Sequence, residues 1–230
     1  MKKGLEKRQD FIQTAETLFC RQGYENTSIQ QILDVLHTSK GSFYHHFESK
    51  EQLLEEICIR RSRTITERII SDAESEDNPL QAMNTLLNGL IPLNGEKLSF
   101  LLMLLPVFTL AEGWSVQHVY CRELAQSLHP ALKGILEKGK EEKFFSPQDT
   151  AITSEIVLML TNELWCSMCE VIIASEKSGT IADPSEVLNL ANAYRTAIER
   201  LLYAPYGSIE LVNLSDIKSL SEQIHAHWKE

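Results

Sequence analysis

The stretch that decides the fold is residues 27–47, which read TSIQQILDVLHTSKGSFYHHF. Apolar residues recur in it at the three- and four-residue spacing of a helix, four of them between Ile29 and Leu36 and two more at Phe43 and Phe47. Only residues 37 and 38 separate the two patterns. The second pattern is apolar on one side and small, polar or basic on the other. Such a pair of helices is typical of a helix-turn-helix, whose second helix enters the major groove of DNA.

Signals for helix ends surround this stretch. Gly23 predicts the end of the preceding helix, because glycine readily adopts the left-handed backbone of a C-cap. Thr27 or Ser28 is the expected N-cap of the next helix, Ser39 that of the third and Ser49 that of the fourth. We therefore expect short turns between the first four helices.

Helical periodicity continues through the rest of the chain, and strand signals are nearly absent. We expect an all-α fold of about nine to ten helices. Residues 1–50 would form a three-helix helix-turn-helix DNA-binding domain, with the motif at about 28–47, and residues 51–230 a larger helical domain. The later helices are expected at about 49–76, from Asn78-Pro79 to Asn94-Gly95, 97–111, from Ser115 to 143 after a break at Glu112-Gly113, 147–176 from Ser146-Pro147, 184–204 from Asp183-Pro184, and 214–228.

Charge is distributed unevenly along the 230 residues, whose formal net charge is −10. Residues 1–50 carry seven Lys/Arg and six Asp/Glu, net +1, whereas residues 51–230 are net −11. A DNA-binding module joined to an acidic body agrees with this asymmetry. The chain shows no signal peptide and no uninterrupted apolar run of the ~18–20 residues that cross a bilayer. Its five cysteines are odd in number and scattered, so we expect reduced thiols in a cytoplasmic protein with no membrane partner.

Residues 39–47 (SKGSFYHHF) and 49–53 (SKEQL) together resemble the recognition helix and fourth-helix start of the TetR (tetracycline-repressor-like) family of transcriptional regulators. The upstream pattern of Ala15, Leu18-Phe19, Gly23-Tyr24 and Thr27 to Ile32 is similar to the first two helices of that family. The resemblance covers about residues 5–60. It departs from the family at His37, where glycine is common, although histidine tolerates left-handed backbone better than most residues.

The resemblance implies a set of DNA-binding residues. Thr27 and Ser28 would bind phosphate at the start of the second helix, as would Tyr44 and Lys50 further on. In the third helix Lys40 would meet the DNA backbone or a base edge, Gly41 and Ser42 would lie against the groove, and His45 would meet a base or a phosphate. The alternatives are that Tyr44 caps the small core and that His45 and His46 face solvent. The full predicted set is Thr27, Ser28, Ser39, Lys40, Gly41, Ser42, Tyr44, His45 and Lys50.

The resemblance also implies that residues 51–230 are a helical ligand-binding and dimerisation domain, and that the protein acts as a homodimer on double-stranded operator DNA. Two recognition helices must lie about 34–36 Å apart, one DNA turn, because one module reads too few base pairs. The last two long helices, 147–176 and 184–204, are expected to pair across a two-fold axis. Their apolar stripes include Ile156, Leu160, Leu164, Leu188, Ala191, Ala193, Ala197, Ile198, Leu201 and Leu202.

An effector cavity is the third expected component. Soft and aromatic side chains at helical spacing are the candidates for its walls, and they favour a small apolar or amphipathic effector. The alternative is that they are ordinary core. The candidates are Phe100, Met103, Leu104, Phe108, Trp114, Tyr120, Trp165, Met168 and Cys169.

The function that these patterns favour is a ligand-released repressor. A ligand-independent or partner-regulated DNA-binding factor and an activator of the same fold remain alternatives. We find no nucleophile elbow, phosphate loop or HExxH, so no catalytic residue, metal site or cofactor is predicted. Cys166-x-x-Cys169 is interpreted as core filler, with a redox or metal role as alternatives.

Overall fold

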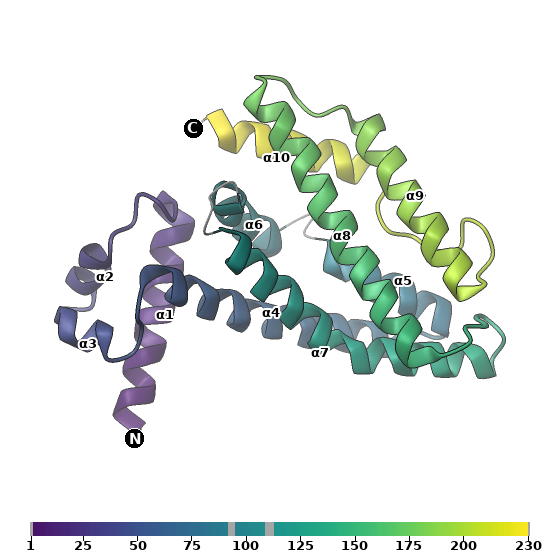
Figure 1. The fold of residues 1–230 in the computed structure, drawn as a ribbon, viewed down its shortest axis with the longest axis horizontal. Helices are drawn as coiled ribbons and strands as arrows, with labels where there is room; N and C mark the ends of the chain where they lie inside the picture. The colour runs from purple at the N-terminus through teal and green to yellow at the C-terminus, as the bar shows by residue number, and fades with distance from the viewer. Residues whose placement is uncertain (1, 92–94, 109–112, 230) are drawn as a thin grey trace. The chain divides into compact units, whose positions relative to one another are not determined.

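The computed structural model describes residues 2–91, 95–108 and 113–229, which form ten helices and no strand (Figure 1). The predicted all-α class is therefore confirmed. In chain order the helices are α1 (Lys2–Gln22), α2 (Ile29–Val35), α3 (Lys40–Tyr44), α4 (Lys50–Glu74), α5 (Pro79–Leu90), α6 (Gly95–Phe108), α7 (Gly113–Glu141), α8 (Thr150–Lys177), α9 (Pro184–Leu202) and α10 (Leu214–Lys229).

The described residues divide into two compact units. The N-terminal unit comprises Met1–Thr64 and Ser99–Glu123, and the C-terminal unit comprises Ile65–Leu98 and Leu124–Glu230. Helices α4, α6 and α7 each contribute to both units. The expected domains, 1–50 and 51–230, follow the linear sequence and remain a prediction.

The N-terminal unit is built on an aromatic core. Phe11 of α1 meets the ring of Phe43 edge-on at 5.6 Å between centroids, and Phe47 lies 5.7 Å from Phe43. All three side chains are buried. Part of α6 joins this core as well, because Phe100 and Met103 belong to the same cluster of buried residues. The core therefore fixes the backs of α1 and α3 and part of α6 in one body.

In the C-terminal unit, α8 lies beside α9, and α10 packs against both (Figure 1). Leu164 and Met168 of α8 and Ile198 of α9 are fully buried. A buried carboxylate, Glu176 near the end of α8, lies 2.8 Å from Nδ1 of His225, so a polar contact joins α8 to α10. These contacts establish the C-terminal unit as a separate helical core.

Helix α8 is also the one helix among the described residues that is long and apolar enough to cross a membrane, by length and composition alone. An 18-residue window of it has a mean hydropathy of 1.6, and 39% of that window is buried. The sequence expectation counted uninterrupted apolar runs, whereas the mean tolerates interruptions such as Thr161 and Glu163. Core helices of globular proteins reach the same hydropathy, and α8 packs against α9 and α10.

Several predicted helix starts are confirmed, and that of α8 is wrong. Asn78 caps α5 and Asp183 caps α9, each with proline at the first turn. Helix α8 begins at Thr150 rather than near Pro147, because the side chain of Asp149 accepts a hydrogen bond from the N–H of Ile152 at 2.9 Å. The residues before it are instead held by the contact of the Ser146 N–H with the carbonyl of Leu202 at 2.9 Å.

Two predicted breaks are displaced. Helix α5 ends at Leu90, and Gly95 begins α6 rather than ending the helix before it. The break at Ile91 arises from its extended backbone, whose N–H donates to the carbonyl of Asn88. Gly113 begins α7, two residues before the expected start at Ser115. Asn94 and Glu112 lie outside the described residues.

Candidate nucleic-acid interface

Two positive-φ residues shape the turns of the candidate interface. Gly23 ends α1 with φ of 85°, and its N–H donates to the carbonyl of Phe19 at 2.9 Å, as its role as a C-cap requires. His37 follows α2 with φ of 47°. The N–H of Thr38 then donates to the carbonyl of Leu33 at 3.1 Å. His37 therefore adopts the left-handed backbone at the position where the TetR family commonly has glycine.

The start of α2 is closed by a capping box. The N–H of Gln31 donates to the hydroxyl of Ser28 at 3.2 Å, and the N–H of Ser28 donates to the Gln31 side chain at 2.7 Å. Ser28 is exposed, so it remains a candidate phosphate contact. Thr27 is different: it is fully buried, and its hydroxyl donates to the carbonyl of Gly23 at 2.8 Å. Thr27 therefore stabilises the turn between α1 and α2, and its hydroxyl does not reach the surface.

Helix α3 presents a polar face above the aromatic core. Ser39 caps the helix by accepting from the N–H of Ser42 at 3.3 Å. Phe43 is buried, whereas the next side chain, Tyr44, is 56% exposed. The Tyr44 ring meets that of Phe43 edge-on at 5.3 Å between centroids, so Tyr44 covers part of the core and also reaches the surface. The other predicted contacts of this helix lie at the surface, with Ser39, Lys40, Gly41 and His45 exposed and Ser42 half-buried.

Gly41 has no packing reason to be glycine. A Cβ atom built on it would meet only the hydroxyl of Ser39, at 3.8 Å, which is ordinary van der Waals contact. Its backbone is helical and not of positive φ. A glycine in a helix costs roughly 1 kcal/mol against alanine. The space above Gly41 therefore lies on the outer face, where a groove wall or a base edge would approach.

Lys50, at the start of α4, is held inside the N-terminal unit. Its ammonium donates to the carbonyls of Tyr24 at 2.9 Å and Thr27 at 3.0 Å, and lies 4.0 Å from the centroid of the Tyr24 ring. The Tyr24 hydroxyl in turn donates to Glu51 at 3.2 Å. Burial lowers the pKa of Lys50 despite the opposing charges of Glu51 and Glu25. Two of its three N–H donors thus tie α4 to the turn before α2, a role that sequence reasoning missed.

A cluster of basic and imidazole groups flanks α3. The Arg8 guanidinium lies 5.1 Å from the Phe47 ring and pairs with Glu56 at 2.6 Å, and Lys7 lies 5.8 Å from the Phe11 ring. The rings of His45 and His46 are 5.0 Å apart. Desolvation and then the charges of His45, Arg8 and Lys7 lower the pKa of His46. Positive charge at this edge of α3 agrees with an anionic partner.

The predicted effector residues fall in two separate cores. Phe100, Met103 and Leu104 are buried in the N-terminal unit, where the Phe100 ring lies 5.8 Å from that of Tyr120. Burial raises the pKa of Tyr120 well above its usual range. Trp165, Met168 and Cys169 are buried in the C-terminal unit. The side chains of Phe108 and Trp114 lie outside the described residues, and the cavity stays a prediction.

Cys169 of α8 is not a ready nucleophile. Cys169 is buried, and burial, followed by the influence of Cys166 and Glu170, raises its pKa well above that of an ordinary thiol. All five cysteines are free thiols. Reactive cysteines are those whose thiolate is stabilised at an accessible site, so Cys169 has the environment of a core residue.

The predicted dimer stripe contains both core and surface residues. Leu164, Ala191, Ile198 and Leu202 are buried within the chain itself. Other stripe members are exposed or partly exposed and lie outside that core: Ile156 and Leu160 on α8, and Leu188, Ala193, Ala197 and Leu201 on α9. Two further apolar residues of α8, Ile152 and Met159, are 56% and 61% exposed. An apolar surface thus runs along the outer side of α8.

A helical body with a helix-turn-helix held on an aromatic core places the chain in the class of helix-turn-helix proteins. Residues 11–57 match the family described as bacterial regulatory proteins, tetR family. The fold agrees: a TetR-family transcriptional regulator from Pectobacterium atrosepticum superposes with a TM-score of 0.63 at 14% identity, over 89% of this chain and 98% of that one. The N-terminal region thus matches the TetR family, and the described helices share the fold of that regulator.

Two curated relatives are similar in the N-terminal region. The HTH-type transcriptional repressor KstR2 of Mycolicibacterium smegmatis is 41% identical over 51 residues, which are 22% of this chain and 25% of that protein. The HTH-type transcriptional regulator TcmR of Streptomyces glaucescens is 35% identical over 80 residues, 34% of each chain. The similarity thus spans about a quarter to a third of these relatives and is concentrated on the helix-turn-helix.

Proposed function

We propose that this chain is a sequence-specific DNA-binding transcriptional regulator, acting in the cytoplasm as a repressor that a small ligand releases from its operator. The observation that carries the proposal is the exposed polar face of α3 above buried Phe43 and Phe47, within the region that matches the TetR family. The proposed DNA contacts are Ser28, Ser39, Lys40, Gly41, Ser42, Tyr44 and His45. Lys50 would support them indirectly, by tying α4 to the turn before α2.

A homodimer on a palindromic operator is part of the proposal. The outer side of α8 offers an apolar stripe of Ile152, Ile156 and Met159, which recur at the spacing of one helix face. On α9, Ala193 and Ala197 are exposed and small enough for close helix approach. Apolar surface of this kind marks interaction sites. Pairing through α8 and α9 would place two recognition helices on successive turns of DNA.

Coupling between effector and DNA would run through the core of the N-terminal unit. Phe100 of α6 lies 5.7 Å from the guanidinium of Arg61 on α4, and Arg61 pairs with Glu16 of α1. Ser115 of α7 donates to Glu55 of α4 at 2.7 Å. Helix α4 therefore contacts both the later helices and the helix-turn-helix. A ligand that shifted α6 would alter α4, and with it α3, to the extent of its differential affinity for the two arrangements.

The nature of the effector is proposed from chemistry and from the fold. The structure of RolR in complex with resorcinol has a TM-score of 0.56 at 15% identity, over 96% of each chain. Small ligands are thus bound by a protein of this fold. For this chain we propose a small apolar or amphipathic effector, since the buried candidate residues of both cores are aromatic, carry sulfur or, at Leu104, are aliphatic.

The test is selection of fragments from the source genome by the full-length protein at several salt concentrations. We expect enrichment of palindromic sites with an affinity that falls steeply as salt rises. The His45→Ala variant should shift the sequence preference, whereas Glu222→Gln on α10 should not. Failure to enrich any sequence would refute the proposal.

The dimer is tested by Met159→Glu, which places a charge in the apolar stripe of α8. We expect light scattering to report a monomer and operator affinity to fall to that of a single half-site. Leu214→Glu changes another exposed apolar residue, 39% exposed on α10, and should leave the dimer intact. A wild-type protein that is monomeric at micromolar concentration contradicts this part of the proposal.

A further inference from the structure

The turn between α2 and α3 is fixed by its own backbone. The N–H of His37 donates to the carbonyl of Asp34 at 3.3 Å, and the N–H of Thr38 donates to the carbonyl of Leu33 at 3.1 Å. The next residue, Ser39, caps α3. Because both N–H groups of the turn are bonded, the fold sets the direction in which the His37 side chain leaves the backbone.

His37 holds its left-handed backbone at a cost that glycine would not bear. At its φ of 47° the Cβ of any L-residue approaches a neighbouring carbonyl oxygen, although histidine tolerates this region better than most residues. Glycine has no Cβ, and the chain uses it just after α1 and α8, at Gly23 with φ of 85° and Gly179 with φ of 74°. A side chain is thus present at position 37 where the turn itself would favour none.

The described residues give the imidazole of His37 no partner. The side chain is exposed, and it makes no hydrogen bond, ion pair or ring contact within the part of the chain that the structure describes. The carboxylate of Asp34, one turn earlier, instead accepts from the Gln30 side chain at 2.8 Å. A ring N–H of His37 is therefore available to a partner outside the chain.

The place of His37 in the motif indicates what that partner is. In a helix-turn-helix the N-terminal residues of the second helix meet base edges, so the turn directly before that helix lies at the edge of the groove, beside the phosphates. Ser39 and Lys40, which follow the turn, are exposed as well. A neutral imidazole carries one N–H donor, so a bond to a phosphate oxygen needs no added proton.

We propose that His37 is a further DNA contact, whose imidazole N–H donates to an operator phosphate at the edge of the groove that α3 enters. The inference rests on the proposed function, because it adds a contact to the same interface. The bonded turn holds the residue in place before DNA arrives, so little conformational freedom is lost on binding.

The test compares His37→Gly with the wild type by fluorescence anisotropy, on the selected operator and on a duplex of unrelated sequence. We expect His37→Gly to bind both duplexes about tenfold more weakly, because a hydrogen bond to a charged group is lost and a phosphate contact carries no sequence preference. The urea midpoint of the variant should equal or exceed that of the wild type, since glycine suits the turn. Equal affinity of the two proteins overturns the proposal.

Two further variants separate the ring from the freedom of the turn. Aspartate also tolerates left-handed backbone but offers no N–H, so His37→Asp should bind at least as weakly as His37→Gly. Lysine adopts this backbone at Lys143, with φ of 64°, so His37→Lys should keep the contact and make the slope of log K against log salt steeper. Wild-type affinity in His37→Asp overturns the proposal, and so does an unchanged slope in His37→Lys.

Tyr203→Gly is the matched control in the C-terminal unit. Tyr203 has φ of 54° at the end of α9, and its side chain is exposed. The segment after it is held by another residue, because Asn84 of α5 donates from Nδ2 to the carbonyl of Ser208 and accepts the N–H of Glu210 at Oδ1, each at 3.0 Å. Tyr203→Gly should therefore shift the urea midpoint in the same direction as His37→Gly and leave the affinity for DNA unchanged.

The outcomes separate this inference from the proposed function. A wild-type protein that binds no duplex removes both. A wild-type protein that binds its operator, together with a His37→Gly variant of equal affinity, removes the contact at His37 alone.

Discussion

The two compact units use their side chains in opposite ways. In the N-terminal unit neighbouring residues are divided sharply between core and surface, as Phe43 is fully buried and Tyr44 is 56% exposed. In the C-terminal unit long helices carry apolar residues both inside and outside, and Leu164 and Met159 on α8 differ in burial but not in chemical type. In the first unit, residue type therefore indicates which side chains face a partner. In the second unit, residue type does not separate core from surface, and only the packing of the helices does.

The largest difference in stability should separate alanine substitutions at the neighbouring residues Phe43 and Tyr44. Phe43→Ala removes a ring that packs on Phe11 and Phe47, and large core truncations of this kind cost about 3–5 kcal/mol. Tyr44→Ala should cost about 1 kcal/mol or less, because only its edge contact with Phe43 is lost. The Tyr44→Ala variant should nevertheless bind every operator sequence more weakly. Urea unfolding and fluorescence anisotropy measure the two effects, and equal destabilisation would remove the contrast.

A smaller effect separates the two lysines of the candidate interface. Lys50→Met removes two hydrogen bonds from an ammonium and should destabilise the chain by about 1–3 kcal/mol. It should weaken DNA binding while the slope of log K against log salt stays unchanged. Lys40→Ala should leave stability within about 0.5 kcal/mol and lower that slope by about 0.9, the value of one phosphate contact. If Lys50→Met also lowers the slope, Lys50 binds phosphate as first predicted.

The smallest effect on stability compares one glycine from each unit. Gly41→Ala should stabilise the chain by about 0.5–1 kcal/mol, because no protein atom opposes a Cβ there. It should also weaken operator binding about tenfold, or 1.4 kcal/mol, by crowding the groove. Gly134→Ala in α7 is the matched control, since a Cβ there has no atom within 4 Å. It should stabilise by a similar amount and leave DNA affinity unaltered, as thermal unfolding and anisotropy will report.

Local signals predicted the fold well. Ser28, Ser39, Asn78 and Asp183 all cap the helices that they were expected to begin, because a capping side chain acts within three residues of its own position. Asp149 was missed because Ser146-Pro147 offers a similar signal just before it. Which of two adjacent caps is used depends on tertiary contacts of the preceding turn.

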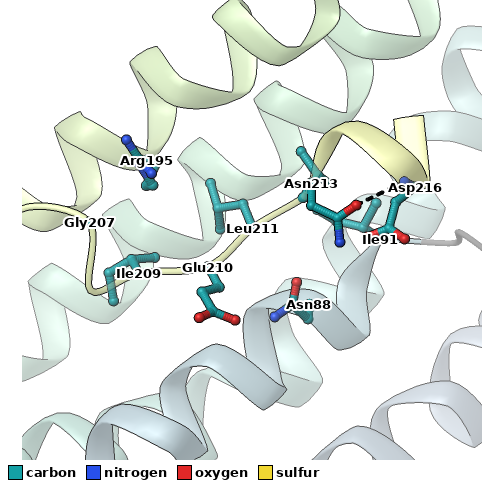
Figure 2. A pocket seen from close by; sticks show the side chains of 10 residues that line it. Asn88, Ile91, Arg195, Gly207, Ile209, Glu210, Leu211, Asn213 and Asp216 are labelled. Atoms are coloured by element: carbon teal, nitrogen blue, oxygen red, sulfur yellow. Dashed lines mark hydrogen bonds between the residues drawn. The ribbon is translucent and has the colours of Figure 1, made fainter. Parts of the chain in front are cut away.

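The sites were predicted less evenly. The exposed face of α3 follows from two phenylalanines four residues apart, but Thr27 and Lys50 could not be placed, since their partners are backbone carbonyls. Periodicity likewise groups Ala191 with Ala193, although one is buried and the other exposed. The pocket of the C-terminal unit that Asn88, Arg195 and Asp216 line left no sequence signal, because these residues lie far apart in the chain and line one cleft only in the folded unit (Figure 2).

The Asn84 amide has a consequence for how motion of the C-terminal unit can be observed. Glu210 is an exposed residue, yet its N–H is bonded to the Asn84 side chain rather than left to water. Its exchange with deuterium should therefore be slower than that of unbonded neighbours and should report each detachment of the segment from α5. The exchange rate of the Glu210 amide proton should thus measure how often the segment between α9 and α10 separates from α5.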